Sequence, residues 1–310
     1  MEILLQCVLL VVGFVMLVKG ADWFVDGAAG IADRFGVPQL VIGLTIVAMG
    51  TSAPEAAVSI AAALKGSADI TIGNIVGSNI LNILIILGLT SVITAVAVAK
   101  STIKIEIPFM LIITLLLLGM GYTGNIVGRG EGVILWIAFL AYLAYLFVMA
   151  KKNKEEVAEE SKKMPLWKLI LAAVIGLVLI VWGSDVTVDA ATAIAKSLGL
   201  SERFIGLTIV ALGTSLPELF TSVSAAIKGK ADIAIGNIVG SNIFNILFVV
   251  GTAAFITPVV FAPNFVIDTL IAVAAGVLLW VCVCKTKKLT RPAGVIMLVG
   301  YAAYFVYLLG

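Results

Sequence analysis

The sequence predicts an all-α, polytopic membrane protein, and three observations carry that prediction. The 310 residues are 62% hydrophobic and only 12% charged, with a mean hydropathy of +1.19, whereas about a quarter of the residues in soluble domains are charged. Ten apolar runs are each long enough to cross the hydrocarbon of a bilayer. The chain also repeats itself in two halves. This composition excludes a soluble globular enzyme.

The ten expected spans follow the apolar runs in order. They lie at about 3–28, 38–64, 69–94, 105–122, 131–150, 166–190, 203–227, 232–256, 265–284 and 292–309. The first run passes into Lys19 and Asp22 without a small-residue cleavage site, so it predicts a retained span and not a signal peptide. A charged segment that cannot be buried follows the fifth run. We therefore expect a five-helix repeat at 1–150, a linker at 151–165 and a second five-helix repeat at 166–310.

The two halves are related by an offset of 163 residues. The segment Gly73–Asn79 recurs letter for letter as Gly236–Asn242, and the register holds without a gap from Asp22 to Asn82. Such a match indicates an internal duplication. Because five spans is an odd number, the second copy enters the membrane from the opposite side. Inverted repeats of this kind place a transport site at their interface near the middle of the bilayer.

The placement of basic residues predicts the orientation. If the N-terminus is external, the loops with most of the Lys and Arg residues, including the charged linker, are all cytoplasmic. We therefore expect both termini to be extracellular and the linker to be cytoplasmic. A short chain without a targeting segment favours a prokaryotic plasma membrane.

Several other functions find no support in the sequence. The net charge is +2, and no basic block is interleaved with aromatic residues, so we expect no nucleic-acid partner. The chain has no histidine, and its cysteines, Cys7, Cys282 and Cys284, lie in apolar runs. We expect no cofactor, no transition metal and no obligate protein partner.

Two spans carry a polar break with a carboxylate, which is costly in hydrocarbon unless it is used. The breaks are Gly50–Glu55 and Gly213–Glu218. The proline in each should interrupt the helical hydrogen bonds, free carbonyls of the preceding turn, and place the glutamate just after the break. In the first half the carbonyl of Ala48 is the one that we expect to be freed.

The following spans add hydroxyl and amide oxygens, so each half supplies the same donors. The candidate site residues are Glu55, Glu218, Thr51, Thr214, Ser52, Ser215, Ser78, Ser241, Asn82 and Asn245, with the carbonyls of Ala48 and Ala211. All of these ligand atoms are hard oxygens, which Na⁺ and Ca²⁺ prefer. Two ionised glutamates balance one divalent ion or most of the charge of a few Na⁺ ions. Competition between the two species for one cluster is what an antiporter requires.

The remaining membrane carboxylates have simpler interpretations. Asp22, Asp26, Asp185 and Asp189 lie near span ends at i, i+4 spacing, which favours interfacial positions. Asp69 and Asp232 precede spans, where a carboxylate suits a helix N-terminus, so we expect both to cap those helices.

The paired motifs resemble the alpha-repeats of the sodium/calcium exchangers, in the cation/calcium antiporter superfamily. They are Gly50–Glu55 with Gly73–Asn79, and Gly213–Glu218 with Gly236–Asn242. The ten-span layout extends the similarity over nearly the whole chain. The lack of a large regulatory domain in the linker resembles the prokaryotic members. The resemblance further implies that spans 1 and 6 slide as a bundle against the ion-binding core.

The same resemblance implies particular roles for the candidate residues. Glu55 and Glu218 would be the principal Ca²⁺ ligands. Thr51, Thr214 and the carbonyls of Ala48 and Ala211 would complete the coordination of both ions, Ser52, Ser78, Ser215 and Ser241 would line Na⁺ sites, and Asn82 and Asn245 would lie between the repeats. Some potassium-dependent relatives carry aspartate where this chain has Asn245. We therefore expect no K⁺ cotransport.

The function expected from the sequence is electrogenic exchange of Na⁺ for Ca²⁺ by alternating access. The main alternative is an exchanger of H⁺ for Ca²⁺, or for another divalent cation, that uses the same two glutamates. A channel remains a weaker alternative. An intramembrane serine protease would normally need a histidine base, which the chain lacks.

Overall fold

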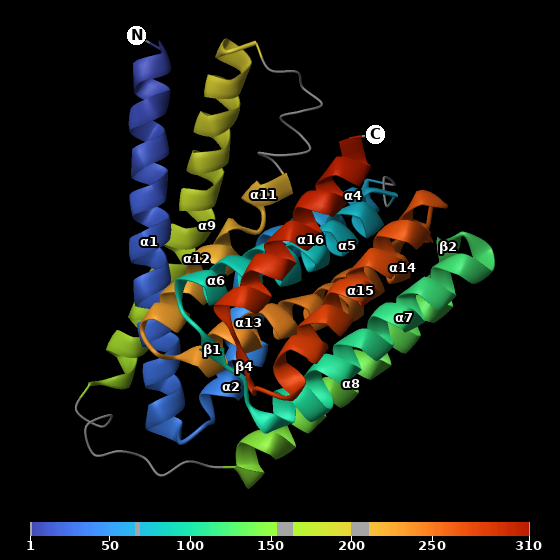
Figure 1. Cartoon of the computed structure of the whole chain (residues 1–310), viewed down its shortest axis with the longest axis horizontal. Helices are drawn as coiled ribbons and strands as arrows, with labels where there is room; N and C mark the ends of the chain where they lie inside the picture. Colours follow the sequence, from blue (N-terminus) through green and yellow to red (C-terminus); the bar gives the residue numbers. More distant parts are fainter. Residues whose placement is uncertain (1, 66–68, 154–163, 200–210, 310) are drawn as a thin grey trace.

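The computed structural model describes residues 2–65, 69–153, 164–199 and 211–309. These residues form helices joined by short turns, together with four strands of two residues each (Figure 1). The predicted all-α class is confirmed. Several helices contain π-helical stretches, which are labelled η.

The elements of the first half run from α1 to α8. They are α1 (Glu2–Phe35), α2 (Gln39–Ile42), η1 (Gly43–Val47), α3 (Ala48–Thr51), α4 (Ala53–Leu64), α5 (Asp69–Leu81), η2 (Asn82–Leu87), α6 (Gly88–Ile93), β1 (Val96–Ala97), η3 (Thr102–Glu106), α7 (Ile107–Gly124), β2 (Ile126–Val127) and α8 (Arg129–Lys152).

The elements of the second half follow in a matching order. They are α9 (Leu166–Ser197), α11 (Ala211–Gly213), α12 (Leu216–Ile227), α13 (Ala231–Phe244), η6 (Asn245–Val250), α14 (Gly251–Ile256), β3 (Val259–Val260), α15 (Asn264–Cys284), β4 (Lys288–Leu289) and α16 (Arg291–Leu309).

Within the described residues, eight helical stretches are long and apolar enough to cross a membrane. A further candidate is the pair Gln39–Thr51 and Ala53–Leu64, which bends by 51° at its break. The expected span at 203–227 is described only from residue 211, and the expected linker is outside the described residues at 154–163. The chain is thus a multi-pass membrane protein, while ten spans remain a prediction.

Two helices continue well past their predicted ends. The apolar runs ended at 28 and 190, but α1 extends to Phe35 and α9 to Ser197. Both are followed by a glycine with a positive φ, Gly36 at 64° and Gly199 at 78°. Glycine adopts this left-handed geometry without steric cost and commonly ends helices. Glycine geometry therefore ends both helices. The ends predicted from hydropathy alone are a few residues too early.

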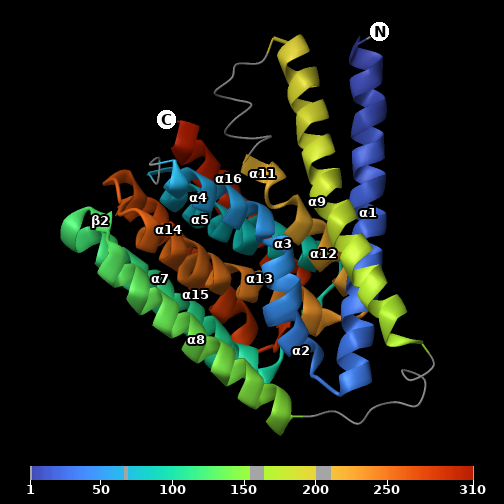
Figure 2. The same cartoon turned by 180° about the vertical axis from the view of Figure 1, so that it is seen from behind.

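The long helices α1 and α9 run antiparallel and lie side by side, as both views show (Figures 1 and 2). Glycines let their backbones approach closely. A Cβ atom on Gly20 would lie 2.8 Å from the carbonyl oxygen of Gly176, and one on Gly183 would lie 3.1 Å from that of Gly13. Small residues permit this kind of helix packing in membranes, where no hydrophobic force drives helices together. The two helices therefore form a closely fitted pair.

The helix α13 lies at the centre of the remaining bundle. All residues from Ile233 to Phe244 are buried, including the polar Asn237 and Ser241. It packs against η1, α3 and α12. Polar groups buried this deeply require partners, and these partners form the site described below.

Two small antiparallel sheets join the halves. The strand β1 pairs with β4, and β2 pairs with β3. Val96 and Val259 are separated by the repeat offset, as are Ile126 and Leu289, so β1 corresponds to β3 and β2 to β4. Each sheet therefore combines one strand from each half, and the repeat exchanges the two sheets.

One capping assignment is wrong. The N-cap of α13 is Lys230, and Asp232 lies inside the first turn. A carboxylate there is still favoured by the positive end of the helix dipole. The side chain of Asp69 is outside the described part of the structure.

Gly176→Ala should lower the thermal stability of the purified protein. The added Cβ would lie 2.7 Å from the carbonyl oxygen of Gly20, and overpacking of this kind costs about 1–3 kcal/mol. Gly119→Ala is the matched control because nothing lies within 4 Å of its Cβ position. Thermal unfolding of both variants in detergent checks the expectation, and equal melting temperatures would contradict the close α1–α9 contact.

Candidate cation-binding site

The first predicted helix break is present between α3 and α4. Ser52 leaves helical geometry with φ −82° and ψ 8°, and Pro54 occupies the first turn of α4. Because Pro54 has no N–H, the carbonyl of Gly50 lacks its usual helical donor. Glu55 follows in the same first turn, where the helix dipole favours a carboxylate.

The second half contains the matching break. Ser215 has φ −94° and ψ 3°, Pro217 lies in the first turn of α12, and Glu218 follows. Here the carbonyl of Gly213 accepts a hydrogen bond from the Ser184 hydroxyl of α9 at 2.6 Å. This hydrogen bond joins the second break to α9, one of the two long helices.

The two glutamates lie in one buried cluster. Glu55 is 1% exposed and Glu218 is fully buried. The Ser52 hydroxyl donates to Oε1 of Glu218 at 2.7 Å, and the Ser215 hydroxyl donates to Oε1 of Glu55 at 3.4 Å. Each carboxylate therefore receives a hydrogen bond from the break of the other half. The hydrogen bonds therefore bring the two predicted glutamates and the two breaks together in one buried region.

Four asparagine side chains connect the halves close to the helices that carry the glutamates, since η2 packs against α12 and η6 against α4. The Asn79 amide donates to the Asn242 backbone carbonyl at 3.3 Å, and the Asn242 amide donates to that of Asn79 at 3.1 Å. The Asn82 amide donates to Oδ1 of Asn242 at 2.9 Å, and the Asn245 amide donates to Oδ1 of Asn79 at 3.2 Å. The π-helical stretches η2 and η6 begin at Asn82 and Asn245, and such turns are frequent at functional sites.

Asn79 and Asn242 were missing from the predicted site. Oδ1 of Asn242 accepts the amide N–H of Asn82, and Oδ1 of Asn79 accepts that of Asn245. The Oδ1 atoms of Asn82 and Asn245 take no part in these hydrogen bonds. The sequence did contain a signal, because both residues end the segment that is repeated letter for letter. Spacing alone did not show that the segments would bond to each other across the halves.

Four oxygen atoms of this cluster are buried and have no hydrogen-bond partner. They are Oε2 of Glu55, Oε2 of Glu218, Oδ1 of Asn82 and Oδ1 of Asn245. Leaving a buried polar group unpaired costs about 1–3 kcal/mol, and more for a charged group. Among the described residues, no lysine or arginine forms an ion pair with either glutamate. The two carboxylate oxygens can therefore bind cations or protons, and the two amide oxygens can bind cations.

The charge of the cluster is limited to the two carboxylates. No group of three or more Asp, Glu, His and Cys side chains suited to a metal ion occurs in the described residues. The other oxygens are neutral hydroxyls, amides and carbonyls. Such a set suits hard cations more than transition metals.

The carbonyl of Ala48 is not freed by the break as expected. It accepts the N–H of Ser52 at 3.0 Å and the hydroxyl of Ser241 at 3.3 Å. The freed carbonyl lies two residues later because the proline removes the donor for Gly50 and not for Ala48. The Thr51 hydroxyl lies 3.0 Å from Oδ1 of Asn237. Ala48 and Thr51 thus both contact α13 of the other half.

The other predicted residues lie at corresponding places. Ser78 is buried in α5 at the position that matches Ser241 in α13. Thr214 lines a cavity of about 380 Å³ between α4 and α9. The backbone of Ala211 begins α11, but it borders residues outside the described ranges and no contact of its carbonyl is described.

The sequence matches the family model for sodium/calcium exchanger proteins over residues 5–148 and 168–310. The match covers both halves. This chain belongs to the sodium/calcium exchanger family. The resemblance seen in the paired motifs is thereby confirmed.

Relatives in this family extend over the whole chain. The putative antiporter CaxA of Alkalimonas amylolytica is 39% identical over 315 residues, which cover 97% of this chain and 98% of that protein. The sodium/calcium exchanger MaX1 of Methanosarcina acetivorans is 31% identical and covers 97% of each chain. A structure of the sodium-calcium exchanger NCX_Mj, soaked with zero Na⁺ and Ca²⁺, superimposes with a TM-score of 0.86 at 32% identity and 99% coverage of both chains.

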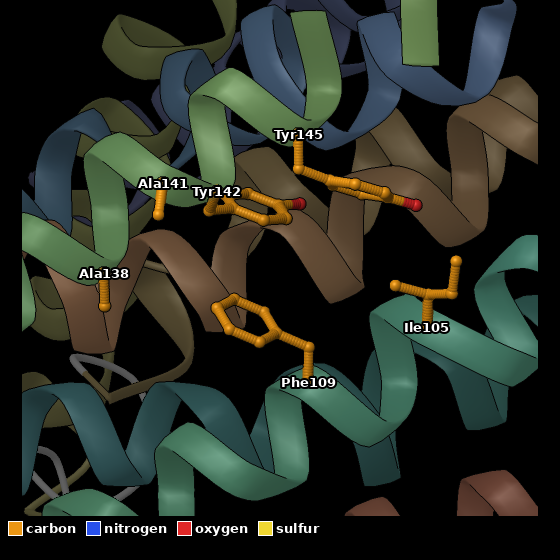
Figure 3. A pocket seen from close by; sticks show the side chains of 6 residues that line it. All are labelled: Ile105, Phe109, Ala138, Ala141, Tyr142 and Tyr145. Atoms are coloured by element: carbon orange, nitrogen blue, oxygen red, sulfur yellow. The ribbon is translucent and has the colours of Figure 1, made fainter. Parts of the chain in front are cut away.

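A third buried carboxyl group, which the sequence did not suggest, lies outside the cluster. Glu106 is fully buried near the start of the α7 span, and Tyr145 of α8 donates a short hydrogen bond to its Oε1. Oε2 of Glu106 has no partner. Tyr145 also borders an apolar cavity of about 320 Å³ between α7 and α8, where it lies next to Tyr142 and faces Ile105 and Phe109 (Figure 3).

Tyr145→Phe should destabilise the exchanger. The change leaves Oε1 of Glu106 without its donor, and a buried unpaired oxygen costs about 1–3 kcal/mol. Tyr122→Phe is the control because Tyr122 is 72% exposed. Melting temperatures of the two variants, compared with the parent protein, check the expectation. A Tyr145→Phe variant as stable as the Tyr122→Phe variant would contradict it.

Proposed function

We propose that this protein exchanges Na⁺ for Ca²⁺ across the membrane by alternating access, with Glu55 and Glu218 as the principal Ca²⁺ ligands. The observation that carries the proposal is the set of four unpartnered oxygens, two from each half, in a cluster without a basic counter-charge among the described residues. The names of the relatives CaxA, MaX1 and NCX_Mj support the same assignment.

Charge compensation makes the two ions alternatives for one site. Two ionised carboxylates neutralise one Ca²⁺, or most of the charge of a few Na⁺ ions. An uncompensated charge in a low-dielectric interior is costly, so the site should not change conformation readily when it is empty. Loaded with either species, it is close to neutral. Exchange is therefore obligatory, because the site changes conformation readily only when it is loaded with one of the two ions.

The remaining residues would complete the coordination. We assign neutral oxygens for both ions to Thr51, Thr214 and the carbonyls of Ala48 and Ala211, and Na⁺ sites to Ser52, Ser78, Ser215 and Ser241. Asn82 and Asn245 would contribute their unpartnered Oδ1 atoms. Hard oxygen ligands in these numbers suit both ions.

The proposed architecture is ten spans in two inverted repeats, at 1–150 and 166–310, joined by a charged linker. Both views place the chain ends toward the same side of the molecule (Figures 1 and 2), which an even number of spans requires. The exchange of the two small sheets by the repeat also supports it. From the distribution of basic residues we further propose extracellular termini, a cytoplasmic linker and a plasma-membrane location.

The alternative coupling ion is H⁺. An unpartnered carboxylate oxygen can accept a proton as well as bind a cation, and Oε2 of both glutamates is unpartnered. An exchanger of H⁺ for Ca²⁺, or for another divalent ion, would therefore use the same two residues. The gradient experiment below separates the two couplings.

Glu55→Gln and Glu218→Gln should each abolish Ca²⁺ uptake into proteoliposomes. One remaining carboxylate cannot neutralise a divalent ion, and loss of one partner of a buried charge pair costs about 2–5 kcal/mol, so Ca²⁺ affinity should fall by about 30-fold or more. Glu131→Gln is the control because the Glu131 carboxylate only accepts the N–H of Gly128 at the start of α8. Normal uptake in either site variant would reject the ligand assignment.

Ca²⁺ uptake should follow an imposed Na⁺ gradient and not a pH gradient alone. If more than two Na⁺ ions move for each Ca²⁺, the exchange carries net charge and must respond to membrane voltage. Uptake is measured with each gradient in turn, with and without K⁺, and with the voltage clamped by an ionophore. Uptake driven by a pH gradient alone would establish the H⁺ alternative. A requirement for K⁺ would contradict the expected K⁺ independence.

A further inference from the structure

The end of α12 is fastened to the middle of α1 by an ion-pair cluster. The Lys228 ammonium lies 2.8 Å from Oδ2 of Asp26 and 3.3 Å from Oδ1 of Asp22, and it donates to the backbone carbonyl of Asp22 at 3.0 Å. The Ser224 hydroxyl donates to the same Oδ1 of Asp22 at 2.7 Å. Asp22 and Asp26 are therefore not simply interfacial, because they bind a residue more than 200 positions away.

The repeat supplies a second set of the same charges on the opposite pair of helices. Residues 163 positions from Asp22, Asp26 and Lys228 are Asp185, Asp189 and Lys65. Asp185 and Asp189 line the cavity of about 380 Å³ between α4 and α9. Lys65 is exposed at the end of α4 and forms no ion pair within the described residues. The second set of charges is therefore present, but Lys65 does not pair with Asp185 or Asp189 in this conformation.

The two cavities differ in how near they come to the helix breaks. The cavity beside Lys228, between α1 and α12, has a volume of about 210 Å³ and includes none of the site residues. The cavity of about 380 Å³ reaches Gly213, Thr214 and Pro54 at the helix breaks. Of these two cavities, only the one beside Asp185 and Asp189 reaches the helix breaks, so we infer that this side is the open one in this conformation.

Part of this difference is encoded in the sequence. Phe220 on α12 faces Phe14 of α1 with ring centroids 6.1 Å apart, and the repeat places Ala57 at the corresponding position of α4. Ser224 likewise corresponds to Ala61. The α1–α12 contact thus has an aromatic pair and an extra hydrogen bond that its counterpart lacks. This favours the conformation in which α1 is held against α12.

We propose that Lys228 is a positioning residue that latches α1 to α12 while the site is open on the other side, and that Lys65 makes the equivalent latch to Asp185 and Asp189 in the opposite conformation. The inference rests on the alternating access proposed above. Because α1 and α9 fit closely, we expect them to move as one unit. A shift that brings α9 against α4 then carries α1 away from α12, so only one latch can form at a time.

Electrostatics gives the second latch its driving force. Asp185 and Asp189 are like charges at i, i+4 spacing, an arrangement that is unfavourable without a counter-charge. Asp22 and Asp26 have the same spacing, but Lys228 lies between them. Closure of α9 onto α4 would bring the Lys65 ammonium toward an uncompensated pair.

The test measures access to the open cavity and not transport. Ala57, which lines that cavity, is replaced by cysteine in a background without Cys7, Cys282 and Cys284. The rate of reaction with a membrane-impermeant maleimide is measured in Na⁺-free and Ca²⁺-free proteoliposomes. Lys228→Ala should slow the labelling by up to about fivefold, because loss of an ion pair of about 1 kcal/mol lowers the ratio of open to closed protein about fivefold.

Three further variants separate a latch from a general effect of charge or folding. Lys228→Arg should restore the parent rate because arginine also pairs with carboxylates. Lys230→Ala, two positions away and in no described ion pair, should leave the rate unchanged. Lys65→Ala, added to Lys228→Ala, should return the rate toward that of the parent because it removes the competing latch.

The outcomes decide the inference independently of the proposed function. An unchanged rate in Lys228→Ala, or an equal slowing in Lys230→Ala, would overturn the latch even if Na⁺-driven Ca²⁺ uptake were normal. Failure of Lys65→Ala to reverse the effect would overturn the second latch. If the labelling responds as expected but no Na⁺-driven Ca²⁺ uptake is found, the latch stands and the ion assignment fails. A Lys228→Ala protein that elutes as aggregate is replaced by Lys228→Gln, with the same expectations.

Discussion

Two carboxylates share one buried site in a protein that lies in hydrocarbon, and this constraint governs the rest of the structure. Each carboxylate is costly there, and their mutual repulsion adds to the cost. The protein compensates them only in part. Ser52 and Ser215 each donate one hydrogen bond across the halves, while Oε2 of Glu55 and of Glu218 has no partner. The incomplete compensation leaves the site in need of cations or protons.

The reciprocal bonding explains why the breaks and the asparagines occur where they do. A continuous helix would direct its own N–H and C=O groups along its axis and leave none for a ligand. Ending α3 at Thr51 places Glu55 at a new helix N-terminus, and the same geometry recurs at Glu218. The amides of Asn79 and Asn242 then hold the two central helices together. Neither half forms the site alone, because each supplies the hydrogen bonds that the other needs.

The α1–α9 pair contrasts with this rigid centre. It packs against α12 and also meets the bundle through the bond from Ser184 to Gly213 and the Lys228 cluster. The bond from Ser184 reaches the break of the second half directly. In the proposed alternating access, a displacement of the pair would change the hydrogen bonding of this break, and it would thereby link ion occupancy to access.

The sequence by itself determined the fold class, nearly all of the described span boundaries, the duplication and the two central glutamates. These features depend on hydropathy, on proline chemistry and on repetition, which are local properties of the chain. The predicted ends of α1 and α9 were short because glycine geometry, and not hydropathy, ends those helices.

Only the tertiary structure decided which atoms remain unpartnered and which carboxylates pair with lysine. The carbonyl of Ala48 gained the donors Ser52 N–H and Ser241, and Asp22 and Asp26 gained Lys228 from the other half. Glu106 found Tyr145 on a neighbouring helix. Hydrogen bonds and ion pairs between distant residues depend on how helices pack in three dimensions, and the spacing of residues along one helix does not contain that information.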